Sequence, residues 1–237
     1  MFAALGHLVM KPFMLIWLYL SPHSWRGLPV PEAGPPVRVD GPHMQSIVLC
    51  GSGVVVGYGV ASHELALGGS IARSLAVMTG RGIEVATITS PRLTTLDAQS
   101  HLNARVLAGV DAVILSFGTF ESLTFMPPKK WARNLTNLVD ALLVNAPPRA
   151  QIFVISCNTP KMSNFVAAYQ RHVFRIGAAY NAEIRALAHQ RERVHHVEFE
   201  PEPEDPEAIE GRQSYRTWAD AIAPSIANEL SDPSANS

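Results

Sequence analysis

The chain is organised around residues 46–60, SIVLCGSGVVVGYGV, where an apolar run meets a series of glycines. The run from Ile47 to Cys50 passes directly into the turn Gly51-Ser52-Gly53. A continuous apolar run that ends at glycine is typical of a parallel strand covered on both faces. In open α/β sheets, ligands bind in the loops at the carboxyl ends of such strands. We therefore expect the loop after residue 50 to form part of the candidate site.

Apolar runs alternate with segments of helical periodicity along the rest of the chain. Short apolar or β-branched runs predict four more strands at residues 83–89, 111–117, 152–156 and 195–199. Helical spacing of apolar residues predicts helices at residues 62–80, 94–107, 131–142, 165–190 and 215–230. Ser62 and Thr94 are the expected N-caps of the first two. Strands that alternate with helices predict a three-layer α/β sandwich around a five-stranded parallel sheet.

The amino-terminal part of the chain has a different pattern. Residues 1–20 predict an apolar helix, but Lys11 and Pro12 at its middle make a full membrane crossing costly. We expect this helix to lie in or on a membrane, with Trp17, Tyr19 and Trp25 at the interface; packing on the protein's own core or in an oligomer interface is the alternative. Residues 21–45 contain six prolines and three glycines and predict an extended linker. Residues 46–230 then form the domain, and residues 231–237 a disordered tail.

Composition excludes several functions. The net charge is −1, the sequence pI is about 6.8, and no basic stripe with interleaved aromatic residues occurs, so no nucleic-acid partner is expected. Cys50 and Cys157 lack metal-ligand spacing and are predicted to be buried free thiols. Glycines 51, 53 and 57 only loosely match a dinucleotide-binding turn, and no acid follows the second strand. We therefore expect neither a metal nor a cofactor.

Four segments carry a family resemblance that covers residues 46–226. They are IVLCGSGVVVGYGVAS after the first predicted strand, LSFGTFESL after the third, then ISCNTPKMSNF, and SYRTWADAIAP before the end. In order and wording they resemble the SGNH (GDSL) hydrolases, which are flavodoxin-like α/β esterases and lipases. The resemblance implies that fold, and it implies a site made of a nucleophilic serine, oxyanion-binding groups and an Asp-x-x-His element. The positions that match this site are Gly53 for the serine, Arg92 for the oxyanion glycine, Gly118 and Phe120 for Gly-x-Asn-Asp, and Pro206 and Ile209 for Asp-x-x-His.

These matched positions lack the side chains that the family's chemistry requires. Acyl transfer through serine needs a nucleophile, a base within hydrogen-bond reach and donors aimed at the oxyanion. Glycine supplies no nucleophile, isoleucine accepts no proton and phenylalanine donates no hydrogen bond. The sequence therefore predicts a non-catalytic pseudo-hydrolase that binds a ligand or a partner. A small acyl or anionic ligand in the cleft is the expected ligand, because a guanidinium at Arg92 can hold a carboxylate or phosphate.

Two other interpretations remain open at this stage. An active ester or lipid hydrolase, an esterase, lipase or acyltransferase, could use a rearranged site around Ser52 and Glu121. Alternatively, a structural subunit could dock on a membrane or on an active paralogue through residues 1–25. The chain would accordingly be membrane-associated or cytoplasmic.

Three further features lack an assigned role. Glu121 is expected to pair with Arg92 or Lys129 across the cleft. His195 and His196 open the fifth predicted strand, where one should face inward and the other outward. Residues 198–210 hold seven acids, which predict a solvated loop, with calcium or a basic partner as the alternative ligand.

Overall fold

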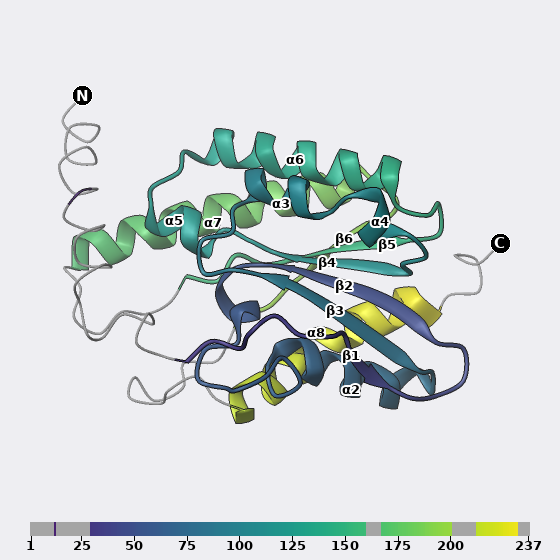
Figure 1. Cartoon of the computed structure of the whole chain (residues 1–237). Coiled ribbons are helices and arrows are strands. Elements are labelled where there is room, and N and C mark those ends of the chain that lie inside the picture. The colour runs from purple at the N-terminus through teal and green to yellow at the C-terminus, as the bar shows by residue number, and fades with distance from the viewer. Residues whose placement is uncertain (1–11, 13–28, 160–166, 201–211, 232–237) are drawn as a thin grey trace.

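The computed structural model describes residue 12 and residues 29–159, 167–200 and 212–231, and all structural statements concern these residues. Six strands form one sheet in the order β1-β3-β2-β4-β5-β6 (Figure 1). Their bounds are β1 Val37–Val39, β2 Gln45–Gly51, β3 Ile83–Thr89, β4 Ala112–Ser116, β5 Gln151–Ile155 and β6 Val194–Val197. The predicted apolar helix at residues 1–20, the tail at 231–237 and most of the acidic loop lie outside the described residues, apart from residues 12, 198–200 and 231.

Five of the strands are parallel, as predicted, but the sheet is mixed. The sixth strand, β1, pairs antiparallel with β3, with Val37 opposite Val85. The prediction of a purely parallel five-stranded sheet is therefore wrong at this edge. β1 lies in the stretch predicted as an extended linker, where prolines and glycines conceal a three-residue strand. A short strand with a charged residue such as Arg38 is a common way to end a sheet.

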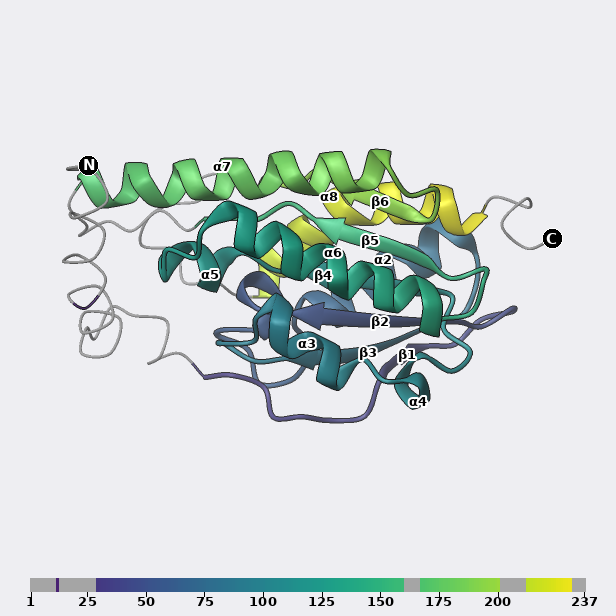
Figure 2. The same cartoon turned by 90° about the horizontal axis from the view of Figure 1, so that it is seen from above.

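Helices cover both faces of the sheet and make the predicted three layers (Figures 1 and 2). On one face lie α2 (Leu67–Thr79) and α8 (Arg212–Ser231). On the other lie α3 (Thr95–His101), α6 (Pro128–Asn145) and α7 (Ala167–His189). Three shorter helices complete the described part of the fold: η2 (Gly53–Val56) follows β2, α4 (Ala104–Leu107) follows α3, and α5 (Thr119–Leu123) follows β4.

The apolar run in β2 is buried on both sides, which confirms its prediction as a doubly covered strand. Ile47 and Leu49 belong to the core under α2 and α8. Val48 and Cys50 belong to the core under α6 and α7. Each of these four side chains is at most 2% exposed. The strand is therefore fixed in the middle of the sheet, and its carboxyl end presents the glycine turn.

Two predicted helix boundaries are wrong. Helix α2 begins at Leu67 without a side-chain cap, because Ser62 lies in a preceding turn where its carbonyl accepts the amide hydrogens of Leu65 and Ala66. The single helix predicted over residues 94–107 is two helices. Thr94 caps α3 as predicted, and then Asn103 accepts hydrogen bonds from two amides and starts α4.

Candidate functional site

The loops at the carboxyl edge of the sheet bring the sequence-predicted positions together. The register places Gly51 of β2 opposite Thr89 of β3 and Ser116 of β4, and Ser116 opposite Ile155 of β5. The segments that contain Gly53, Arg92 and Gly118 therefore leave the sheet side by side. Pro206 and Ile209 lie outside the described residues.

Gly53 occupies a position where a side chain does not fit. Its φ is +69°, a left-handed conformation that favours glycine. A Cβ atom built there would lie 2.7 Å from Thr119 Oγ1. Thr119 is itself held, because its hydroxyl donates a hydrogen bond of 2.7 Å to the carbonyl of Asn158. A serine at position 53 would therefore require both a strained backbone and a shift of α5.

Ser52, the nearest hydroxyl, points into protein rather than into an open cleft. Its backbone amide donates to the Ser116 carbonyl at 2.9 Å, which ties the turn to β4. The residue is only 1% exposed, and its Oγ has no hydrogen-bond partner among the described residues. A serine hydroxyl without a base beside it is a weak nucleophile.

Glu121 forms a structural bridge between two loops. Its Oε1 accepts the Thr95 amide hydrogen at 2.9 Å, and its Oε2 accepts that of Gly118 at 3.0 Å. The side chain is fully buried, and burial raises its pKa even though these amide hydrogen bonds lower it. The prediction that Glu121 pairs with Arg92 or Lys129 is therefore wrong. Both carboxylate oxygens are already bound to backbone amides.

Arg92 and Phe120 lie at the surface of the same region. Arg92 is exposed in the turn between β3 and α3, and no ion pair involves it within the described part of the chain. Phe120 is half-buried in α5. The guanidinium thus remains available to an anion, whereas Phe120, at the position that the resemblance matches to the oxyanion asparagine, offers an aromatic ring.

Sequence reasoning missed a serine–histidine pair at the neighbouring strands. Ser156 directly follows β5, and its Oγ lies 2.8 Å from His196 Nε2. His195 projects to the opposite face, where its Nε2 lies 2.8 Å from Gln151 Oε1 and its ring stacks on Phe153. The two histidines do lie on opposite faces of the sheet, but both are half-buried, so the expectation that one faces inward and the other outward is wrong. The pairing itself depends on strand register, which places Val154 opposite His196.

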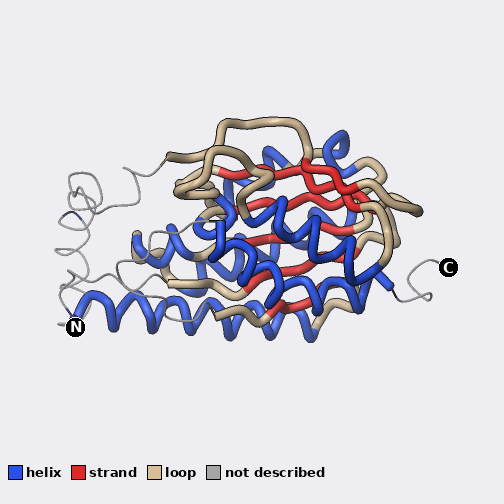
Figure 3. The backbone as a smooth tube through the Cα atoms, turned by 90° about the horizontal axis from the view of Figure 1, so that it is seen from below, coloured by secondary structure: helices blue, strands red, loops and turns tan. Residues whose placement is uncertain are grey.

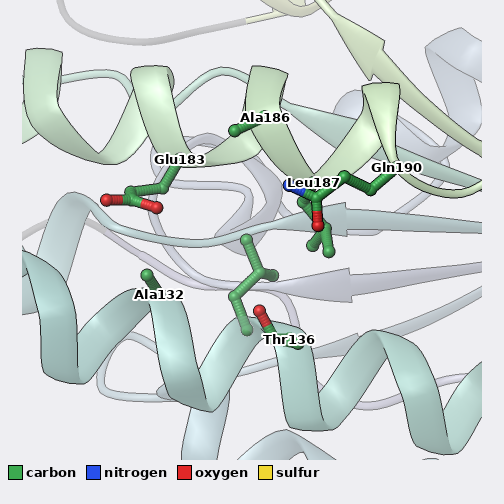
Figure 4. Close-up of a pocket in the computed structure, with 7 residues that line it drawn as sticks. Ala132, Thr136, Glu183, Ala186, Leu187 and Gln190 are labelled. Atoms are coloured by element: carbon green, nitrogen blue, oxygen red, sulfur yellow. The ribbon is translucent and has the colours of Figure 1, made fainter.

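A shallow cavity of about 80 Å³ lies elsewhere, between α6 and α7 (Figure 4). Small and apolar side chains make most of its wall, and Glu183 supplies a carboxylate. The lining residues are Ala132, Leu135, Thr136, Glu183, Ala186, Leu187 and Gln190. Because it lies between two packed helices, it is separate from the loops at the carboxyl edge.

Cys50 and Cys157 are free and buried, as predicted. Burial raises the pKa of the Cys50 thiol to about 12, so this thiol is unreactive at neutral pH. Within the described ranges, no three or more His, Cys, Asp or Glu side chains gather as metal ligands. None of the helices in those ranges combines the length and apolar character needed to cross a bilayer.

No protein-family model matches the sequence, and no curated protein matches it. Solved structures do resemble the fold. A family two carbohydrate esterase from Cellvibrio japonicus is 14% identical with a TM-score of 0.58, over 81% of this chain and 63% of that chain. The psychrotrophic esterase EstA from Pseudoalteromonas sp., inhibited by monoethylphosphonate, is 16% identical with a TM-score of 0.58, over 79% and 100%. The aryl esterase of M. smegmatis is 16% identical with a TM-score of 0.57, over 78% and 98%.

These neighbours identify the architecture as that of the SGNH hydrolases, as the four sequence segments predicted. The chain spans about 63% of the length of the Cellvibrio esterase and nearly all of the two smaller ones. At these identities the likeness concerns the fold. What the loops at the carboxyl edge do must be argued from their own side chains.

Proposed function

We propose that this chain is an SGNH-hydrolase-like protein that lacks the family's serine-ester chemistry in its cleft and acts there by binding a small anionic or acyl ligand. The observation that carries the proposal is Gly53. It matches the position of the nucleophile, its φ is +69°, and Thr119 fills the space that a Cβ would need.

The remaining cleft residues support the same proposal. In serine hydrolases, removal of the nucleophile or the base alone costs on the order of a million-fold in turnover. Phe120 supplies no side-chain donor for an oxyanion. Glu121 is fully buried, and its two oxygens accept the Thr95 and Gly118 amide hydrogens, so it links two loops and is not exposed to a ligand.

Arg92 suggests the class of ligand. Its guanidinium is exposed at the edge where α/β folds bind ligands and has no ion-pair partner in the described ranges. Guanidinium groups bind carboxylates and phosphates through two parallel hydrogen bonds. A small molecule with a carboxylate or phosphate beside an acyl chain would fit this arrangement.

The alternative of an active site around Ser52 and Glu121 receives no support from these contacts, since the Ser52 hydroxyl bonds to no base among the described residues and Glu121 is bound to backbone. Docking through residues 1–25, on a membrane or on an active paralogue, lies outside the described residues. It stays a separate proposal, which a vesicle co-sedimentation of the full chain against a chain without residues 1–28 would test.

We expect neither Ser52 nor an introduced serine at the family position to react with a fluorophosphonate serine-hydrolase probe. The native chain, Ser52→Ala and Gly53→Ser are treated with the probe, digested and mapped by mass spectrometry. Gly53→Ser combined with Thr119→Ala gives the new hydroxyl room and serves as the matched control for steric exclusion. All of these should lack a labelled peptide from residues 46–60, because no hydrogen bond joins a base to the Ser52 hydroxyl within the described residues.

A probe adduct on Ser52 of the native chain would overturn the proposal, and its disappearance in Ser52→Ala would identify a moved nucleophile. An adduct on the introduced serine of Gly53→Ser would show that the base and oxyanion donors are still present. The first result would show that the site is catalytic, and the second that a single substitution makes it so.

A further inference from the structure

Ser156 and His196 form a nucleophile and base in contact, one strand beyond the cleft just described. Ser156 stands at the carboxyl end of β5, and His196 is the third residue of the edge strand β6. The Oγ to Nε2 distance of 2.8 Å lies within the range of a catalytic serine–histidine pair. In the part of the chain that the structure describes, by contrast, no imidazole bonds to the Ser52 hydroxyl.

The surroundings of His196 favour the neutral imidazole. Burial lowers its pKa, the positive charge of Arg185 on α7 lowers it further, and Glu198 acts in the opposite direction. A neutral ring whose Nδ1 carries the hydrogen leaves the Nε2 lone pair facing Ser156. It can therefore accept the serine proton at neutral pH.

His196 is partly exposed at the edge of the sheet, and Ser156 is nearly buried beside it. β6 is the last strand, and helix α7 runs along this edge of the sheet (Figure 3). His196 is half-buried, and Ser156 keeps 8% of its surface exposed. Arg185, also exposed, extends from α7 on the same side and provides a cation next to the imidazole.

We propose that Ser156 and His196 act as a nucleophile and its general base toward small carboxylic esters that carry an anionic group, which Arg185 binds. This site goes beyond the proposed function, which concerns the cleft after β2 and β4. It requires neither Ser52 nor Glu121.

The reaction balances with groups already present. Ser156 Oγ forms a bond to the ester carbonyl carbon while its proton passes to His196 Nε2. The bond from that carbon to the alcohol oxygen breaks, and the alcohol leaves with the proton from Nε2. Water, deprotonated by His196, then hydrolyses the acyl-serine and restores both residues.

A purely structural role for the pair predicts different behaviour. The Oγ also accepts the Phe199 amide hydrogen at 3.4 Å, so it could serve only to fasten the chain after β6. A hydroxyl that only holds this segment in place is not activated and should not react with an electrophile. Labelling therefore separates the two roles, because it reports reactivity and not stability.

The test is fluorophosphonate labelling of the native full-length chain, with the modified residue mapped by mass spectrometry. The Oγ–phosphorus bond forms as fluoride leaves, and the serine proton passes through His196 to solvent. We expect a single adduct on Ser156 that Ser156→Ala removes. His196→Gln should slow its formation by about 10²–10⁴-fold, the usual contribution of a general base. His195→Gln is the matched control and should label at the native rate, because His195 lies on the other face of β6.

Two further readouts test the base and the substrate class. The labelling rate should be level above pH 6.5 and fall in acid as His196 protonates, with Arg185 and Glu198 the charged groups acting on it. Mono-p-nitrophenyl succinate should be cleaved faster than p-nitrophenyl acetate, and Arg185→Gln should remove that preference.

No adduct on the native Ser156 would overturn this inference and leave the proposed function intact. Equal labelling of His196→Gln and His195→Gln would also overturn it, since the imidazole would then not act as a base. An adduct on Ser52 instead would contradict the proposed function, and the mapped peptide distinguishes the two failures.

Discussion

Replacement of Gly118 by alanine is expected to lower the free energy of unfolding by about 2–5 kcal/mol, the sum of backbone strain and overpacking. Gly118 has a φ of +110°, which L-residues rarely adopt. Its added Cβ would also lie 2.6 Å from Cys157 Sγ and 3.1 Å from a ring carbon of Tyr180. Neither neighbour can move freely, because Cys157 is buried and Tyr180 stacks on Trp131 with ring centroids 4.1 Å apart.

Gly80→Ala is the matched control for this experiment. Gly80 also has a positive φ, +66°, but an added Cβ there meets no atom within 4 Å. Its replacement should cost only the backbone strain, about 1–2 kcal/mol. Urea denaturation of both variants measures the difference. Equal losses at the two glycines would show that the packing around Gly118 yields easily and that strain alone matters.

The fold was predictable because its main signals are local. The apolar run of β2 needs no distant information, and β3 was predicted at its observed residues, 83–89. β1 was missed because three residues among prolines become a strand only through pairing with β3. Ser62 was a reasonable helix cap by type, yet its carbonyl closes a turn and the helix starts five residues later.

The candidate site was only partly predictable, for the same physical reason. The family-matched positions follow from sequence order, so the gathering of Gly53, Arg92 and Gly118 at one edge was expected. Whether a particular polar side chain is buried, however, cannot be predicted from the sequence pattern alone. A carboxylate at the end of a strand suggests an ion pair, whereas Glu121 is enclosed and bound to two amides.

Ser156 and His196 show a second limit. Forty positions separate them, and their contact depends on the register between β5 and β6. The only sequence signal was the adjacent pair His195 and His196 in a predicted strand, which guarantees that one imidazole faces each side. The face of the sheet on which a serine lies beside an imidazole could not be predicted without the register.

The enclosure of Glu121 should also make the stability of the protein depend on pH in an unusual direction. Burial raises the pKa of this carboxyl in the folded state above its ordinary value of 4.5. The folded state therefore binds the proton more tightly than the unfolded state does. The contribution of Glu121 to stability is complete below about pH 4.5. It is lost as the pH rises through the raised folded-state pKa.

Glu121→Gln is expected to remove this dependence. The amide cannot ionise, so the difference in unfolding free energy between native protein and variant should shrink as the pH rises from 4.5. At acid pH the variant should be less stable by about 1–3 kcal/mol. The glutamine NH2 group replaces one carboxyl oxygen, so one of the two backbone N–H groups loses its acceptor. Urea denaturation from pH 4.5 to 8 measures both quantities.

The comparison between variants isolates Glu121 from other titrating groups. Burial lowers the pKa values of His195 and His196, so they destabilise the folded state as the pH falls below 6.5 in both proteins. Glu192→Gln, at an exposed carboxylate, controls for the loss of one negative charge. A constant difference between native protein and Glu121→Gln across the range would mean that Glu121 titrates alike in both states. The Glu121 side chain, which bridges the loops after β3 and β4, would then be as readily ionised in the folded state as in the unfolded state. Separation of these loops would release no proton from Glu121.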